Sequence, residues 1–136
     1  MKVSIIIPVY NAQDTVGKCM DSIIRQSSDE WEIIAINDGS TDNSWSVLEK
    51  YAKSHPGRIR VFNQENSGVT KTRERGIKEA CGSYVMFIDN DDYIEQDYVE
   101  TFLREIESGD YDVVVGGYRR ITDKKKILFQ YCPVSR

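Results

Sequence analysis

Short apolar runs alternate with stretches of helical spacing along this chain of 136 residues. In the run from residue 3 to 7 almost every position is apolar and β-branched, as in a strand that is buried on both faces. From Asp14 onward the apolar residues recur every three or four positions, which predicts an amphipathic helix. The alternation continues to residue 116. We predict strands over residues 3–7, 31–36, 59–62, 84–88 and 112–116, with a helix between each successive pair.

This order of elements predicts an α/β fold with a Rossmann-like, mostly parallel central sheet and helices on both faces. We expect a single domain over residues 1–136, in which 119–136 form a hairpin and tail with a basic tip at 123–126. In the third helix we expect Val69, Gly76, Ile77 and Ala80 to face the sheet.

Composition narrows the class of protein. A net charge of −4 and a pI near 5.1 argue against a general nucleic-acid binder, which needs a basic face. No apolar run has the length of a membrane span, and the three cysteines form no C-x-x-C pair. We therefore expect a cytoplasmic protein. Trp31 and Trp45 are interpreted as packing residues and not as a platform for a sugar.

Polar clusters follow three of the predicted strands, at residues 8–11, 37–42 and 89–92. In a doubly wound sheet, ligands bind beyond the carboxyl ends of the strands, near the point where the strand order reverses. If the order is 3-2-1-4, the first and fourth strands are neighbours at that point and the second lies alongside. The chain contains neither G-x-G-x-x-G nor the P-loop motif, which argues against dinucleotide binding and a P-loop phosphate site.

The densest of these clusters is Asp89-Asn90-Asp91-Asp92. Three carboxylates within four residues repel one another, and a divalent cation removes that cost. Hard oxygen ligands at this density suit Mg²⁺ or Mn²⁺. The alternative is an acidic turn that opens the following helix.

Arg73 lies on the third helix, on the side that we expect to face the sheet. A buried arginine needs an acidic or hydrogen-bonding partner. We expect either a structural ion pair with Asp38 or Asp89, or a guanidinium that frames a nucleotide base.

Four segments, in order, resemble glycosyltransferase family 2, the inverting enzymes with the GT-A fold. They are residues 5–11, residues 32–42, Asn66-Ser67-Gly68 with Arg73 and Gly76-Ile77, and residues 82–92; the similarity runs from about residue 1 to 118. The chain differs from the usual family pattern in having Asn37 before Asp38 and Glu74 after Arg73.

The resemblance implies binding of a nucleotide-sugar donor, most often a UDP-sugar, and transfer to a saccharide or lipid-linked acceptor in polysaccharide biosynthesis. It implies that Tyr10 lies near the base, that Asp38 accepts a hydrogen bond from it, and that Asp91 coordinates Mn²⁺ or Mg²⁺. Asp89 would reach the ribose or the metal, and Asp92 would be a further ligand. The nucleotide-binding residues implied in this way are Pro8, Val9, Tyr10, Asn11, Asp38, Gly39, Arg73, Asp89 and Asn90.

An inverting transfer needs a general base, and family members carry that carboxylate well after the metal motif. We expect it beyond Arg136, and we expect the chain by itself to be inactive or weakly active, with an exposed apolar surface that promotes self-association. The resemblance also implies peripheral association with the inner membrane face.

Three other hypotheses compete. A related nucleotidyltransferase would have a glycine-rich and basic loop, which residues 11–14 lack, and a receiver-like module would have an acid pair after the first strand. A non-catalytic nucleotide-binding or interaction module stays open.

Overall fold

The computed structural model describes residues 1–109, 111–122, 124 and 127–131. The chain divides into two compact units, residues 1–99 and 100–136. The first unit contains the sheet and the loops at its carboxyl edge, and the second contains most of the last helix and a hairpin.

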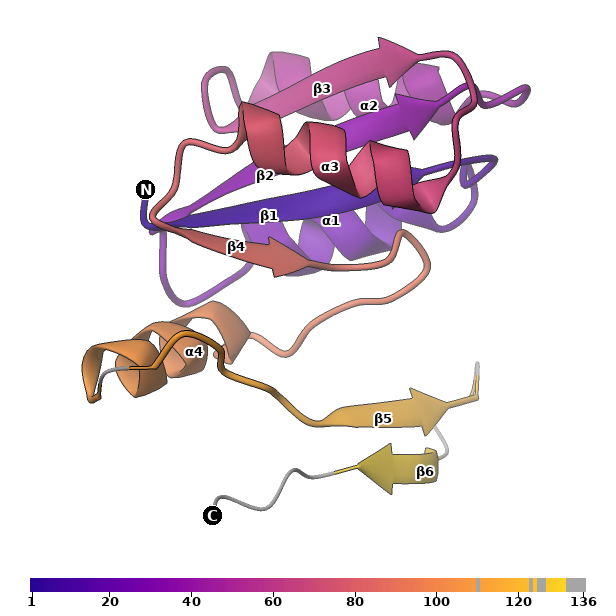
Figure 1. Ribbon diagram of the computed structural model, residues 1–136. Helices are drawn as coiled ribbons and strands as arrows, with labels where there is room; N and C mark the ends of the chain where they lie inside the picture. Colours follow the sequence, from indigo (N-terminus) through magenta and orange to yellow (C-terminus); the bar gives the residue numbers. More distant parts are fainter. Residues whose placement is uncertain (110, 123, 125–126, 132–136) are drawn as a thin grey trace. The chain divides into compact units, whose positions relative to one another are not determined.

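The first unit is built on a parallel sheet of four strands, which confirms four of the five predicted strands and their parallel arrangement (Figure 1). Its order is β3-β2-β1-β4, so β1 and β4 are neighbours and the predicted order is confirmed. The strands are β1 (Val3–Val9), β2 (Trp31–Asp38), β3 (Ile59–Gln64) and β4 (Tyr84–Phe87).

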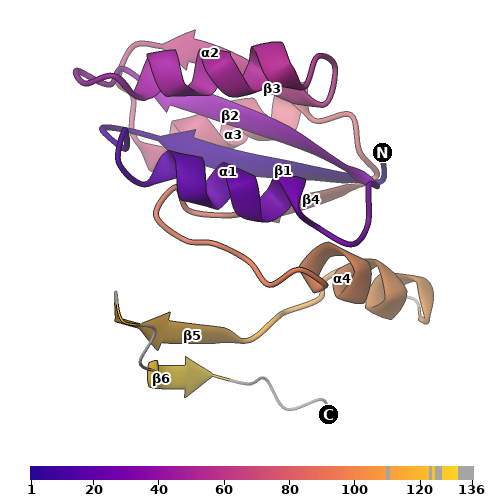
Figure 2. The same ribbon diagram turned by 180° about the vertical axis from the view of Figure 1, so that it is seen from behind.

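Helices cover both faces of this sheet, which confirms the predicted α/β architecture (Figures 1 and 2). The helix α3 (Val69–Glu79) crosses β1 and β2 on one face, while α1 (Val16–Ile24) and α2 (Ser44–Ser54) lie on the other. Both central strands are buried along their whole length, which explains their nearly continuous apolar sequence.

The core beneath α3 is formed by Ile6, Ile34 and Ile36, with Phe62 and Ala80 packed against them. A Cβ atom at Gly76 would overlap Cγ2 of Ile6. The glycine therefore lets α3 approach the sheet more closely than any other residue would allow.

Two predictions about the inward face of α3 were wrong. Val69 and Ile77 are about half exposed, and the buried positions of the helix are Thr72 and Gly76. The close approach at Gly76 turns the helix so that a hydroxyl and a glycine face the sheet, and the larger apolar residues lie at the side. Apolar spacing alone did not reveal this rotation.

A buried carboxylate joins the strands near their amino ends. Glu32 is 1% exposed and accepts hydrogen bonds from Ser4 Oγ at 2.6 Å, Cys81 N at 2.8 Å and Arg60 Nη2 at 3.0 Å. Burial alone would raise the pKa of Glu32, but these bonds and the Arg60 charge outweigh it and lower the pKa. Every polar contact needed to bury this charge is thus supplied by the chain.

In the second part of the chain the predicted hairpin is confirmed, because β5 (Tyr118–Ile121) and β6 (Ile127–Tyr131) pair antiparallel. The helix α4 runs over Tyr98–Glu107. Of the predicted basic tip, residues 123, 125 and 126 lie outside the described residues. None of the helices within the described residues is long and apolar enough to cross a membrane.

The predicted fifth strand at residues 112–116 was wrong, because no strand is present there. Val113 and Val115 are 75% and 65% exposed. A run of valines forms a strand only when a neighbouring strand takes up its backbone hydrogen bonds, and no described strand pairs with these residues.

Candidate functional site

The loops that follow β1, β2 and β4 meet at the carboxyl edge of the sheet. The Asn90 side chain donates from Nδ2 to the carbonyl oxygen of Pro8 at 3.0 Å, which links the loops after β4 and β1. Asn11 N donates to Ser40 Oγ at 3.0 Å, and Thr41 N donates to Asn11 Oδ1 at 2.8 Å. The three polar clusters predicted to converge therefore lie together.

Asn11 adopts the left-handed conformation, with φ of 46°. Asparagine tolerates this region better than most residues, and here its side-chain bond to Thr41 stabilises the turn. The neighbouring Tyr10 is 51% exposed, whereas Pro8 and Val9 are buried. A ligand at this turn would therefore contact the Tyr10 side chain and the backbone.

Asp38, the last residue of β2, is 4% exposed and faces the amino end of α3. Its Oδ1 accepts bonds from Ser67 N at 2.8 Å, Gln64 Nε2 at 2.9 Å and Ser67 Oγ at 3.2 Å, and its Oδ2 accepts one from Gly68 N at 3.0 Å. Burial alone would raise the pKa of Asp38, but these bonds lower it.

Asp38 thus fixes the loop before α3 as a charged acceptor. The sequence analysis named Asp38 but missed Gln64 and Thr72. Gln64 Nε2 donates both to Asp38 Oδ1 and to Thr72 Oγ1, the latter at 3.1 Å. Gln64 could have been identified as a site residue from its position at the end of β3, where it pairs with Asp38 in the strand register.

Gly39 follows Asp38 with φ of 68°, and a Cβ there would lie 2.6 Å from Asn66 N. Only glycine fits this turn, because both the backbone conformation and the close backbone of the next loop exclude a side chain. Asn66 Nδ2 donates to the Asp38 carbonyl oxygen at 3.0 Å and closes the turn.

The carboxylates of Asp89, Asp91 and Asp92 have oxygens within 4.8 Å of one another, and all three residues are exposed. Although Asp92 is exposed as a residue, its carboxyl is partly buried, and this burial raises its pKa; the charges of Asp91 and Asp89 raise the pKa further. A divalent cation with oxygen ligands would relieve this repulsion. The residues present thus fit a Mg²⁺ or Mn²⁺ ion.

Cys19 lies beneath this acidic cluster, with its Sγ 3.5 Å from the carbonyl oxygen of Asp89. Burial, and then the charges of Asp92, Asp91 and Asp89, raise its pKa to about 12. The thiol therefore stays protonated and donates to the backbone that leads into the cluster.

Arg73 reaches the acidic cluster from α3. Its Nη2 lies 3.2 Å from Asp89 Oδ1, so of the two ion pairs that we considered, the pair with Asp89 forms. The guanidinium also lies 5.7 Å from the centre of the Phe87 ring. Its Nε is buried and has no partner among the described residues.

In parallel α/β sheets of this kind, ligands bind beyond the carboxyl ends of the strands at the switch point, and here that point carries a group of carboxylates, an arginine and a charged acceptor. The model of the family "Glycosyl transferase family 2" matches residues 4–131. The chain belongs to this family, which confirms the resemblance.

The curated relatives agree. A glycosyltransferase named GlyA from Streptococcus pneumoniae is 39% identical over 128 residues, which are 94% of this chain and 18% of the relative. An uncharacterized glycosyltransferase, EpsJ of Bacillus subtilis, is 40% identical over 90% of this chain and 36% of its own length. The matched part thus spans 18% of the length of GlyA and 36% of the length of EpsJ.

Solved structures place the fold among the GT-A glycosyltransferases. TarS residues 1–349 of S. aureus, crystallised with UDP, matches with a TM-score of 0.74 and 30% identity over 79% of this chain and 32% of the other. The same part of TarS was also crystallised with UDP-GlcNAc. A mannosyltransferase of Pyrobaculum calidifontis, 22% identical with a TM-score of 0.73 over 88% of this chain and 36% of its own, has the same fold.

Proposed function

We propose that this chain is the donor-binding part of a metal-dependent, inverting sugar transferase that uses a nucleotide-diphosphate sugar, with a UDP-sugar as the first candidate. The observation that carries the proposal is the placement of the Asp89, Asp91 and Asp92 carboxylates beside Arg73 at one edge of the sheet. The UDP and UDP-GlcNAc complexes of TarS support the choice of uridine nucleotides.

Asp91 would hold the divalent ion, with Asp89 and Asp92 as its further ligands. When bound, Mn²⁺ or Mg²⁺ supplies positive charge for the diphosphate leaving group. Without the ion, three exposed carboxylates and a net charge of −4 repel a diphosphate. Donor binding should therefore depend strongly on the metal.

The base of the nucleotide would lie between Tyr10 and the Asp38–Gly39 turn. Asp38 Oδ1 already accepts three bonds, whereas Oδ2 accepts one, from Gly68 N. A base N–H would therefore reach Oδ2. Asn11 and Asn90 would act mainly by holding the loops together, because their side chains bond to Thr41 and to the Pro8 carbonyl.

We further propose that the proton acceptor and the acceptor-binding residues belong to sequence outside this chain, and that the chain alone binds the donor but transfers sugar weakly or not at all. In support, the curated relatives are much longer than the matched part. One of them, from Bacillus spizizenii, is a poly(ribitol-phosphate) beta-glucosyltransferase, 34% identical over 127 residues and covered to 20% of its length. A saccharide or lipid-linked acceptor at the cytoplasmic membrane face fits the same proposal.

The test is calorimetric titration of UDP into the chain with and without Mn²⁺, beside GDP and an Asp91→Ala variant. We expect UDP to bind only with Mn²⁺, and the variant to lose that binding. A matched control is Asp97→Ala, an exposed aspartate just before α4 that lies outside the carboxylate cluster. UDP binding that is equal with and without Mn²⁺ would contradict the metal site, and binding of neither nucleotide would favour the non-catalytic module.

A further inference from the structure

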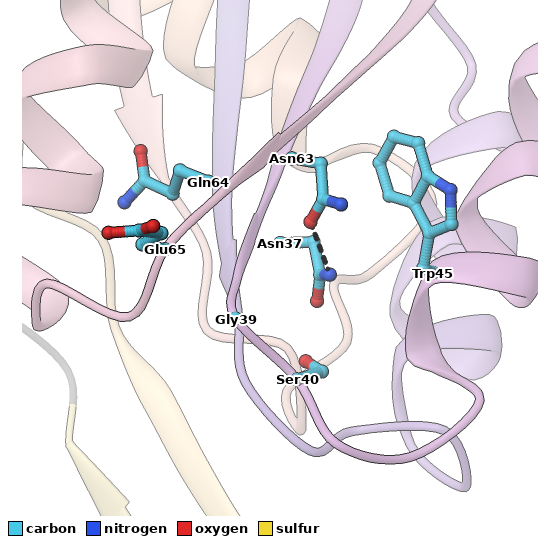
Figure 3. A pocket seen from close by; sticks show the side chains of 7 residues that line it. All are labelled: Asn37, Gly39, Ser40, Trp45, Asn63, Gln64 and Glu65. Carbon is cyan, nitrogen blue, oxygen red and sulfur yellow. Dashed lines mark hydrogen bonds between the residues drawn. The ribbon is translucent and has the colours of Figure 1, made fainter.

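A depression lies at the ends of β2 and β3, and part of it is on the other face of β2 from Asp38. It has a volume of about 510 Å³. Because Asn37 and Asp38 are successive residues of one strand, their side chains point to opposite faces, so the part of the depression at Asn37 and Trp45 is on the α2 side. Gln64 and Glu65 lie on the other side of β3 (Figure 3). Its lining residues are Asn37, Gly39, Ser40, Trp45, Asn63, Gln64 and Glu65.

Asn37 is the unusual residue of this depression. It is 2% exposed, and its Nδ2 donates to Asn63 Oδ1 at 2.8 Å. Its Oδ1 is buried and has no hydrogen-bond partner among the described residues. A buried carbonyl oxygen without a donor is rare and costly, so a ligand that supplies the donor would be favoured.

The walls of the depression offer an aromatic face and polar groups. Trp45, on α2, is only half-buried, which departs from the packing role expected of it. Figure 3 shows its indole on the same side of β3 as Asn37 and Asn63. The Asn37 oxygen is directed toward Ser40 and away from the bond to Asn63 (Figure 3).

These groups select a class of ligand. An indole face beside amide and hydroxyl groups suits a neutral ring that carries hydroxyl groups. The exposed carboxylate of Glu65 accepts hydroxyl hydrogen bonds and repels phosphate. Because no cationic residue lines the depression, a nucleotide is disfavoured here.

We propose that the α2 side of this depression is a saccharide-binding site, distinct from the acidic cluster of Asp89, Asp91 and Asp92, with Trp45 as its stacking surface and Asn37 Oδ1 as an acceptor for a sugar hydroxyl. Since Asn37 Oδ1 is closed to solvent, the side chains around it must move when the hydroxyl reaches it. The proposal does not rest on donor binding at the acidic cluster.

The test observes the two indole N–H signals of the ¹⁵N-labelled chain while cellobiose, chitobiose or uridine is added at millimolar concentration. Trp31 is an internal control, because it is 2% exposed and lies under the Arg58 guanidinium at 3.8 Å. We expect a disaccharide to shift the Trp45 signal and leave the Trp31 signal in place, and uridine to shift neither. A disaccharide that leaves Trp45 unchanged, or a Trp45 shift with uridine instead, would overturn the proposal.

Variants sharpen the test. Saturation transfer to the disaccharide should weaken at least tenfold in Trp45→Leu. If that variant fails to fold, Glu65→Gln should weaken binding several-fold, while Glu49→Gln, on α2 outside the depression, should match the parent chain. Equal binding by Glu65→Gln and the parent would count against the site.

Asp91→Ala separates the two proposals. We expect it to remove metal-dependent UDP binding and to leave the disaccharide shift of Trp45 unchanged. Loss of the disaccharide shift in Asp91→Ala would place both ligands in one site and would overturn the separate saccharide site.

Discussion

Arg73 Nη2 lies 3.2 Å from Asp89 Oδ1, and this ion pair joins α3 to the first carboxylate after β4. The two side chains are 40% and 58% exposed, so the pair by itself adds little to stability. The buried Nε of the same guanidinium has no partner among the described residues. An arginine placed in this way retains a hydrogen-bond donor for a ligand.

Replacing Arg73 by methionine should therefore reduce ligand binding more than stability. We expect Arg73→Met to weaken Mn²⁺-dependent UDP binding about tenfold, because one charge-assisted contact is lost. The free energy of unfolding should change by less than about 1 kcal/mol. Calorimetric titration and urea unfolding check the two values.

The control for this prediction is Lys71→Met, an exposed lysine on the same helix. It removes the same charge without touching the acidic cluster, so its UDP affinity should stay close to that of the parent chain. If both variants lost UDP affinity equally, the effect of Arg73 would be explained by net charge alone, and the proposed contact with the ligand would be contradicted.

Asp38→Asn should destabilise the loop before α3. The amide cannot accept all four bonds that the carboxylate receives, and we expect a loss of about 2–4 kcal/mol at neutral pH. Urea unfolding at about pH 7 measures it, with Asp29→Asn as the control at an exposed position outside this loop.

The same pair of proteins makes a pH prediction. Because the pKa of Asp38 is lower in the folded chain than its ordinary value of 3.8, its stabilising contribution is complete above pH 3.8. It is lost as the pH falls through the lowered folded-state pKa. The difference in unfolding free energy between the parent and Asp38→Asn should therefore narrow below pH 3.8, and a constant difference would contradict the lowered pKa.

Gly76→Ala should destabilise the fold, because its Cβ would overlap Ile6 Cγ2 under α3. The added methyl group must displace either the helix or a fully buried isoleucine, which costs about 1–3 kcal/mol despite the higher helix propensity of alanine. Thermal unfolding measures the change. The control is Glu74→Ala, an exposed position on the same helix that should be neutral or slightly stabilising.

Self-association is the remaining prediction. Val113 and Val115 are 75% and 65% exposed, and Tyr118 and Ile127 on the hairpin are 60% and 52% exposed. We expect light scattering to show concentration-dependent association, and Val113→Thr with Val115→Thr to weaken it several-fold by removing apolar surface. A monomer at all concentrations would contradict this expectation.

Sequence pattern was sufficient for the four strands of the sheet and for the loops at its carboxyl edge. Continuous apolar runs identify strands buried on both faces, and the rule of right-handed crossovers then leaves few topologies. The clusters after β1, β2 and β4 meet because parallel strands all end at one edge. The spacing of Asp89, Asp91 and Asp92 indicated a metal site for the same reason, since residues so close in sequence cannot be far apart in space.

Features that depend on contacts between residues distant in sequence were decided only by the tertiary structure. The close approach of Gly76 to Ile6 rotates α3, so Val69 and Ile77 are exposed although their spacing indicated burial. The valines at 112–116 have high strand propensity, but a strand needs a partner that local sequence does not specify. The unpartnered oxygen of Asn37 likewise has no sequence signal, because hydrogen-bond satisfaction depends on what α2 and β3 bring beside it.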